Sequence, residues 1–169
     1  MIRNLFAVLL LTMSTVVMAE TKMAILDQNM ALFGSDAAKA ETEKLKSEYG
    51  DDEQRIKKLE SEVNDLKSKL ETDAVILEAS EQDKIKQTIQ ERLAERSSLI
   101  DKLKQIQSQR QNQFIREYQP TMAKAVKAIV EQQQIDVVVE AGAVIYVNDA
   151  LNITQQVQDE FNKMVKEGK

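Results

Sequence analysis

Apolar residues recur at helical spacing through the middle of the chain. A repeat of about 3.5 residues is the signature of a left-handed coiled coil. The first run steps by alternating threes and fours, with one seam position skipped at Asp52: Leu45, Tyr49, Ile56, Leu59, Val63, Leu66 and Leu70. A looser second run has Arg96 and Arg110 at seam positions and contains Ile85, Ile89, Leu93, Ile100, Leu103, Ile106 and Phe114. The pattern predicts two long helices.

The chain turns back between these runs. The sequence Ser80-Glu-Gln-Asp83 fits a Ser-x-x-Asp helix start, so we expect the second helix to begin near Ser80. Gly50 lies inside the first run, but the spacing continues across it, which predicts a bend and not an end. Pro120 removes a helical hydrogen bond, so we expect the second helix to be kinked or restarted there.

After residue 134 the period changes from helix to strand. Residues 135–140 and 143–147 are β-branched runs separated by Ala141-Gly142, which predicts a strand hairpin. Met23-Ala-Ile-Leu26 is a third candidate strand. Thr154 is expected to cap a short amphipathic helix that carries Val157, Phe161, Met164 and Val165 on one side.

These elements predict an α+β fold, a small β-sheet body with a long antiparallel helical hairpin arm. The first strand and the C-terminal sheet are about 110 residues apart, so they can pair only if the hairpin is an insertion. We place the arm at residues 39–120 and the β-rich body at residues 20–38 and 121–169. A body this small is marginal without disulfides, metals or oligomerisation. We therefore expect self-association through the strand residues Ile25, Val137, Val138, Val139, Val144 and Ile145.

The first nineteen residues have the layout of a secretory signal peptide. Arg3 precedes a mostly apolar stretch of about 14 residues that ends in Val17-Met18-Ala19. The alternative is an uncleaved membrane anchor, but a spanning helix needs roughly 20 apolar residues. We therefore expect cleavage after Ala19 and export of the mature chain.

Composition excludes several chemistries. The sequence has no Cys, His or Trp, four Gly and one Pro. A thiol nucleophile, an imidazole base, a disulfide and the usual zinc sites are therefore excluded. The carboxylates of Asp51-Asp52-Glu53 lie in a charged helical stretch with no partner base and no apolar pocket, as an acid–base site would need, and the four glycines form no phosphate-binding loop. We expect no enzyme, cofactor or metal, and the formal net charge of −5 disfavours nucleic acid.

Charge divides between the two arm helices. Residues 39 to 83 hold 8 basic and 14 acidic residues, while residues 84 to 130 hold 10 basic and 4 acidic. Helices of opposite charge attract each other, although each exposed pair contributes little. The division favours pairing of the two helices. The alternative is two solvated faces whose charges happen to segregate.

Particular residues in this arrangement resemble the Skp/OmpH family of periplasmic outer-membrane-protein chaperones. They are Lys22-Met-Ala-Ile-Leu-Asp27, Tyr49-Gly50, and most of all the stretches Ile135–Val139, Ala143–Tyr146 and Asn152-Ile-Thr154. The resemblance implies a homotrimer whose body strands form an intersubunit β-barrel. It also implies that the arms enclose unfolded outer-membrane proteins without ATP.

If the arms hold clients as the resemblance implies, some arm residues contact them. The chain also differs from the family in its net charge. We expect Val75, Ile76 and Leu77 near the tip and Phe114, Ile115 and Tyr118 near the cavity roof to contact clients; ordinary packing is the alternative. Family members are often basic, whereas residues 20–169 hold 22 basic and 28 acidic residues. Contact with anionic lipid stays open, with no residue pattern to support it.

Two alternatives are open, one for the basic residues of the arm and one for the function of the whole chain. The basic residues Arg92, Arg96, Lys102 and Lys104 are interpreted first as the partner face of the acidic helix and second as a contact for acidic clients. The alternative to a chaperone is an exported coiled-coil spacer or adaptor that bridges envelope proteins.

Overall fold

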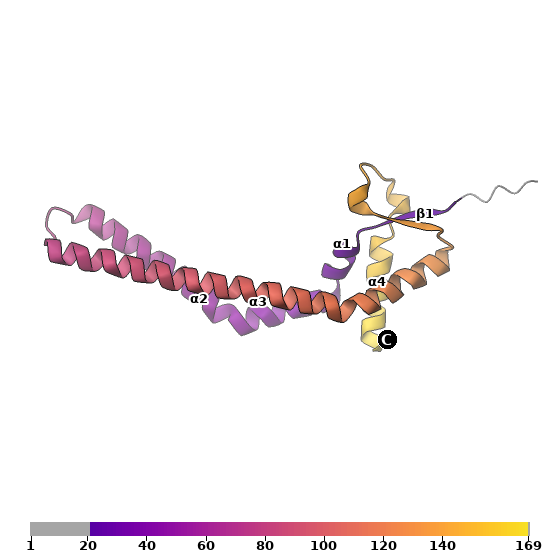
Figure 1. Cartoon of the computed structure of the whole chain (residues 1–169), viewed down its shortest axis with the longest axis horizontal. Coiled ribbons are helices and arrows are strands. Elements are labelled where there is room, and N and C mark those ends of the chain that lie inside the picture. Colours follow the sequence, from indigo (N-terminus) through magenta and orange to yellow (C-terminus); the bar gives the residue numbers. More distant parts are fainter. Residues whose placement is uncertain (1–20, 169) are drawn as a thin grey trace, which may run out of the picture.

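The computed structural model describes residues 21–168, so the expected signal peptide lies outside the described residues. The chain forms a long arm and a small body (Figure 1). The arm consists of two antiparallel helices, α2 (Asp36–Thr72) and α3 (Ala79–Gln133). The body contains β1 (Met23–Leu26), α1 (Gln28–Phe33), β2 (Val137–Glu140) and α4 (Thr154–Glu167), with short 3-10 turns at Ala141–Ala143 and Asp149–Leu151.

Both arm helices run through their predicted breakers. Gly50 lies within α2 and Pro120 within α3, so neither residue ends a helix. Of the two alternatives expected at Pro120, a kink or a restart, the restart does not occur. The ribbon of α3 changes direction in its orange part, close to the body (Figure 1), as expected where proline removes a helical hydrogen bond.

The start of α3 differs from the sequence prediction in its cap. The helix begins at Ala79, and its N-cap is Glu78, which makes no side-chain cap hydrogen bond. Ser80 is already helical, so the predicted Ser80–Asp83 cap is wrong. The turn before α3 is instead closed by Gln82, whose Nε2 donates to two carbonyl oxygens of the turn.

Apolar packing along the arm is uneven. Leu59 of α2 is fully buried. Towards the free end, six apolar residues form what we call the tip cluster: Val63, Leu66, Leu70, Leu77, Ile85 and Ile89. Leu93 is 42% exposed, in agreement with the looser seam expected for the second helix. The arm is thus a thin two-helix structure whose apolar seam is closed in places and open in others.

The two body strands pair in parallel across the inserted arm. Met23 pairs with Val137, and Leu26 pairs with Glu140. This pairing confirms that the hairpin is an insertion that leaves and returns. On the other side of β1, Ile153 N donates to Ile25 O at 2.9 Å.

The second strand of the predicted C-terminal hairpin does not form. A 3-10 turn at Ala141–Ala143 follows β2, and residues 144–147 are not in a strand. Val144 has extended backbone angles, φ −119° and ψ 132°. A strand also needs a neighbour to complete its hydrogen-bond ladder, and among residues 21–168 β2 pairs only with β1. The hairpin prediction is therefore wrong for the single chain.

The body core lies where α3, α4 and the short elements meet. Phe161, Val157 and Met122 are fully buried within it. The N-cap of α4 is Ile153, so the prediction that Thr154 caps this helix is wrong. The Thr154 hydroxyl instead accepts a hydrogen bond from Asp27 N at 2.9 Å, which ties α4 to the end of β1.

Candidate functional site

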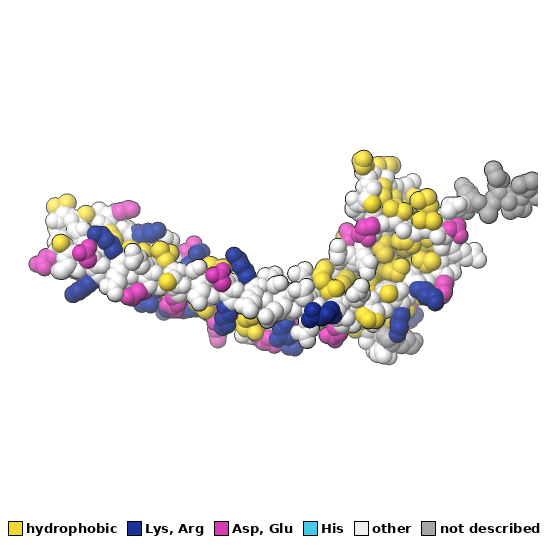
Figure 2. All heavy atoms as spheres, in the orientation of Figure 1, with side chains coloured by type: hydrophobic (Ala, Val, Ile, Leu, Met, Phe, Trp, Pro, Cys, Tyr) yellow, Lys and Arg dark blue, Asp and Glu magenta, His cyan; other side chains and the backbone are white. Residues whose placement is uncertain are grey.

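The arm tip carries the most exposed apolar side chains of the arm. Val75 is 98% exposed and Ile76 is 80% exposed, whereas Leu77 is half-buried in the tip cluster. In Figure 2 a group of yellow side chains lies at the free end of the arm beside magenta carboxylates. Two of the three residues predicted at the tip are therefore available to a partner.

The three residues predicted near the cavity roof lie where the arm joins the body. Phe114 is 7% exposed and contacts Tyr118 with ring centroids 4.7 Å apart. Tyr118 in turn meets Phe161 of the body core edge-on at 5.8 Å. Ile115 and Tyr118 are half-buried against the core. This aromatic row anchors α3 in the body, so these side chains offer far less surface than the tip does.

The environment of Tyr118 shifts its ionisation. Burial raises the pKa of the Tyr118 hydroxyl above its ordinary value, because the charged phenolate loses solvation. The negative charges of Glu117 and Glu41 raise this pKa further. The neutral hydroxyl is therefore the favoured form in the folded chain.

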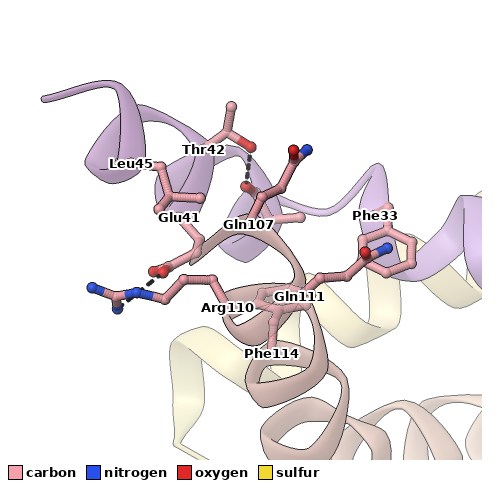
Figure 3. Close-up of a pocket in the computed structure, with 9 residues that line it drawn as sticks. Phe33, Glu41, Thr42, Leu45, Gln107, Arg110, Gln111 and Phe114 are labelled. Atoms are coloured by element: carbon pink, nitrogen blue, oxygen red, sulfur yellow. Dashed lines mark hydrogen bonds and ion pairs between the residues drawn. The ribbon is translucent and has the colours of Figure 1, made fainter. Parts of the chain in front are cut away.

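A pocket of about 240 Å³ opens at the root of the arm (Figure 3). Its apolar wall includes Phe33 of α1, whose ring stacks on Phe114 with 6.1 Å between the two ring centroids. On its polar side, Arg110 donates to Glu41 at 3.4 Å and to Glu48 at 2.9 Å. The other lining residues are Ala38, Thr42, Leu45, Gln107 and Gln111. Because Arg110 is already paired with two carboxylates, its charge is largely neutralised within the chain.

Sequence reasoning missed the contribution of Phe33 to this pocket. Phe33 belongs to a short six-residue helix, too short for a periodic pattern to show which side is buried. The only available signal was an aromatic residue in a chain with 4% aromatics.

The predicted oligomer-interface residues divide into covered and open positions. Ile25 is buried within the chain itself, whereas Val138, Val139 and Val144 are half-buried. Val137 is 41% exposed, and Ile145 is fully exposed. Five further apolar side chains of the body that were not predicted are also exposed: Met23, Met30, Phe33, Tyr146 and Leu151. Figure 2 shows yellow side chains gathered over this part of the body.

Ion pairs join the two arm helices as the charge division predicted. Arg92 pairs with Glu62 at 3.0 Å, and Lys102 pairs with Asp52 at 2.7 Å. Arg96 also reaches the acidic helix, with a nitrogen 3.6 Å from Glu60. For these three residues the partner-face interpretation is confirmed. Lys104 has no ion pair within residues 21–168.

Comparison with known proteins decides the family. Residues 22–161 match the sequence model of the family described as outer membrane protein (OmpH-like). The chain belongs to the OmpH-like family. The match includes both body strands and the whole arm, so it extends well beyond the coiled-coil pattern that any helical hairpin would share.

Individual relatives agree with the OmpH-like assignment. The chain is 25% identical over 146 residues to the Skp-like protein of Pseudomonas aeruginosa, covering 86% of this chain and 87% of the relative. It is 24% identical over 149 residues to chaperone protein Skp of Pectobacterium atrosepticum, covering 88% and 90%. A solved OmpH-like outer membrane chaperone from Caulobacter crescentus shares the fold, with a TM-score of 0.52, 18% identity and 88% coverage of each chain.

These findings support a chaperone role for this OmpH-like chain. The Pectobacterium and Caulobacter proteins are named as chaperones, and none of the three names describes an enzyme. Within the described residues, no cluster of three or more Asp or Glu side chains is placed to hold a metal ion. None of the described helices is both long and apolar enough to cross a membrane.

Proposed function

We propose that this chain is a periplasmic holdase chaperone that works without ATP. It holds unfolded outer-membrane β-barrel proteins in a cavity between the helical arms of a homotrimer. The observation that carries the proposal is the arm tip, where Val75 and Ile76 stand in solvent on a long projecting hairpin. The names of the relatives support a chaperone role, and the arm tip provides an exposed apolar surface for binding clients.

A chaperone for many different unfolded chains needs weak contacts in several places. Each arm offers only a few apolar side chains, so a single arm binds weakly. Several arms joined at one body convert later contacts into intramolecular ones, which multiplies the overall affinity. Release then needs no nucleotide, because a client that folds elsewhere withdraws its apolar side chains from the arms.

The open edge of the body supports assembly. The described chain has a sheet of only two strands, and sheets this small are marginal in isolation. Residues 144–147 follow the 3-10 turn after β2, and their side chains Ile145 and Tyr146 are exposed. In the proposed trimer this segment and Val137 contact a neighbouring copy and complete an intersubunit barrel.

An aggregation assay tests the proposal directly. Several unrelated β-barrel membrane proteins are diluted from urea with and without the chain at about one trimer per client. We expect reduced light scattering for most of them. Failure on every client would end the holdase proposal, and a stable monomer in multi-angle light scattering would contradict the assembly.

A spacer or adaptor remains the second candidate because the arm is densely cross-linked by ion pairs. Ion pairs join α2 to α3 along much of the arm, and their cations are Arg55, Arg92, Lys102 and Arg110. A rod of this kind suits a bridge between two fixed partners. A spacer would capture one tight partner and leave denatured β-barrel proteins to aggregate.

A further inference from the structure

The turn at the arm tip is held in a fixed shape. The backbone N–H groups of Ile76 and Leu77 donate to the carbonyl oxygen of Asp73 at 2.9 and 3.0 Å. From the start of α3, Gln82 Nε2 donates to the carbonyl oxygens of Ala74 and Leu77 at 3.1 and 3.2 Å. The Leu77 side chain packs into the tip cluster. The turn therefore keeps its shape without help from the two side chains at its outermost point.

Those two side chains, Val75 and Ile76, face solvent. Single exposed apolar residues are common, but here two adjacent β-branched side chains share one fixed turn. β-branched side chains have few rotamers, and the backbone is already ordered, so a partner that covers them loses little conformational entropy. The turn is a small pre-organised apolar surface.

Negative charge predominates around this surface. Residues 71–83 contain five acidic residues and no basic residue: Glu71, Asp73, Glu78, Glu81 and Asp83. Two of them have cations nearby, since Lys69 is 3.9 Å from Glu81 and Lys86 is 3.2 Å from Asp83. The other three have no ion pair within the described residues. The apolar turn thus has an acidic rim.

We propose that the arm tip docks client segments in which apolar side chains lie beside Lys or Arg. This proposal rests on the proposed holdase function and specifies the kind of segment that the tip selects. Val75 and Ile76 cover the apolar side chains of the segment, while Glu71, Asp73 and Glu78 attract its cations. Segments flanked by acidic residues, and anionic membrane surfaces, are repelled by the same rim.

Photo-crosslinking detects such a weak contact. The chain has no Cys, so Ser80→Cys in the full mature chain accepts one benzophenone label beside the tip. The probes are three peptides with the same apolar core, flanked by Lys, by Ser or by Glu. We expect crosslinking yields in the order Lys, Ser, Glu, with roughly a threefold or larger difference between Lys and Glu at low salt, and a smaller difference at high salt.

Matched variants separate charge from apolar contact. In the labelled chain, Glu71→Gln with Glu78→Gln should abolish the preference for Lys flanks. Asp51→Asn with Glu53→Gln changes the net charge by the same amount in the middle of α2 and should leave the preference for Lys flanks unchanged. Val75→Ser with Ile76→Ser should lower the yield for all three peptides. All six side chains are exposed, and circular dichroism verifies that each variant keeps its helices.

The outcomes distinguish this proposal from the holdase proposal. Equal yields for Lys and Glu flanks, or a preference that survives Glu71→Gln with Glu78→Gln, would overturn the tip proposal even when aggregation is suppressed. Vesicles containing phosphatidylglycerol test the lipid alternative. If the wild-type chain binds them and the variant with Val75→Ser and Ile76→Ser does not, the tip binds lipid instead. A wild-type chain that suppresses no aggregation would refute the holdase function itself.

Discussion

Arg55 of α2 forms a two-point contact with Glu95 of α3. The Nε and Nη2 groups of Arg55 donate to the two carboxylate oxygens of Glu95 at 2.8 and 2.9 Å. Glu62 and Arg92 extend this contact into a ring of four charges that alternate in sign. Along α2, Arg55 and Glu62 lie on either side of the buried Leu59, and Glu62 is next to Val63 of the tip cluster, so the ring lies beside a closed part of the apolar seam.

We expect Glu95→Gln to loosen the arm around this ring. An exposed or half-exposed ion pair contributes up to about 1 kcal/mol, so the expected effect is local opening and not unfolding. Hydrogen exchange should accelerate in α2 and α3 on both sides of the ring. The matched control is Glu91→Gln, because Glu91 is exposed and accepts a hydrogen bond from Gln87 of the same helix. Equal exchange in both variants would show that the ring does not hold the helices together.

We expect Leu59→Ala to cost far more than a comparable change at an open seam position. Leu59 is fully buried, and truncation of a buried Leu costs about 2–5 kcal/mol. Leu93→Ala is the control, because Leu93 is 42% exposed and should cost less than about 1 kcal/mol. Urea unfolding at one fixed protein concentration measures both, since oligomer stability depends on concentration. Similar losses would mean that the buried stretch of the seam is no better packed than the open one.

We expect Ile145→Asp to reduce the assembly mass while the chain keeps its helices. Ile145 is fully exposed in the single chain, so a charge there does not disturb the chain's own core. In an assembled body the same charge would be buried without a partner, which is costly. Size-exclusion chromatography with light scattering measures the mass. Val75→Asp places the same charge at the exposed tip and should leave the mass unchanged; an unchanged mass for Ile145→Asp would place the interface elsewhere.

We expect stability to fall above about pH 10 in part because of Tyr118. Burial raises the pKa of its hydroxyl, so the folded chain holds this proton more tightly than the unfolded chain does. The stabilising contribution is complete below the unfolded pKa and is lost as the pH rises through the raised folded pKa. The free energy of unfolding of the wild type should therefore decline more steeply with pH than that of Tyr118→Phe.

The exposed Tyr146 provides the control for this pH effect. Tyr146 is 86% exposed, so Tyr146→Phe should keep the wild-type slope. Urea unfolding from about pH 9 to pH 11 compares the three proteins. Parallel curves for wild type and Tyr118→Phe would remove Tyr118 as a source of the decline.

The helices and the inserted topology could be predicted because their signals are local. The three-four spacing around Leu59 and Val63 depends on neighbouring turns of the same helix. The inserted topology followed from two short runs that can each be recognised locally as strands, Met23–Leu26 and Val137–Glu140. The ion pairs of Arg92 and Lys102 could be anticipated because the two helices carry opposite net charge.

Features that depend on distant contacts could not be predicted. Val144 and Ile145 have strand-forming side chains, but the described chain provides no neighbour for them, so no strand forms. Thr154 resembles an N-cap in sequence, yet its hydroxyl accepts a hydrogen bond from Asp27, 127 residues away. The position of Phe33 beside Phe114 likewise depends on how α1 meets the root of the arm. The surface at Val75 and Ile76 was recognised, whereas the Gln82 contacts that fix its shape were not.

The parallel pairing of β1 with β2 imposes an order on folding. The helical hairpin has mostly local contacts and can form as soon as its own residues are available. β1, although it comes first in the chain, has to wait until residues 137–140 and the segment after them have been made, since pairing and packing with these residues offset the cost of closing so long a loop. A chain that lost its C-terminal quarter would therefore still build an arm but could not close the body that joins one arm to the next in the proposed trimer.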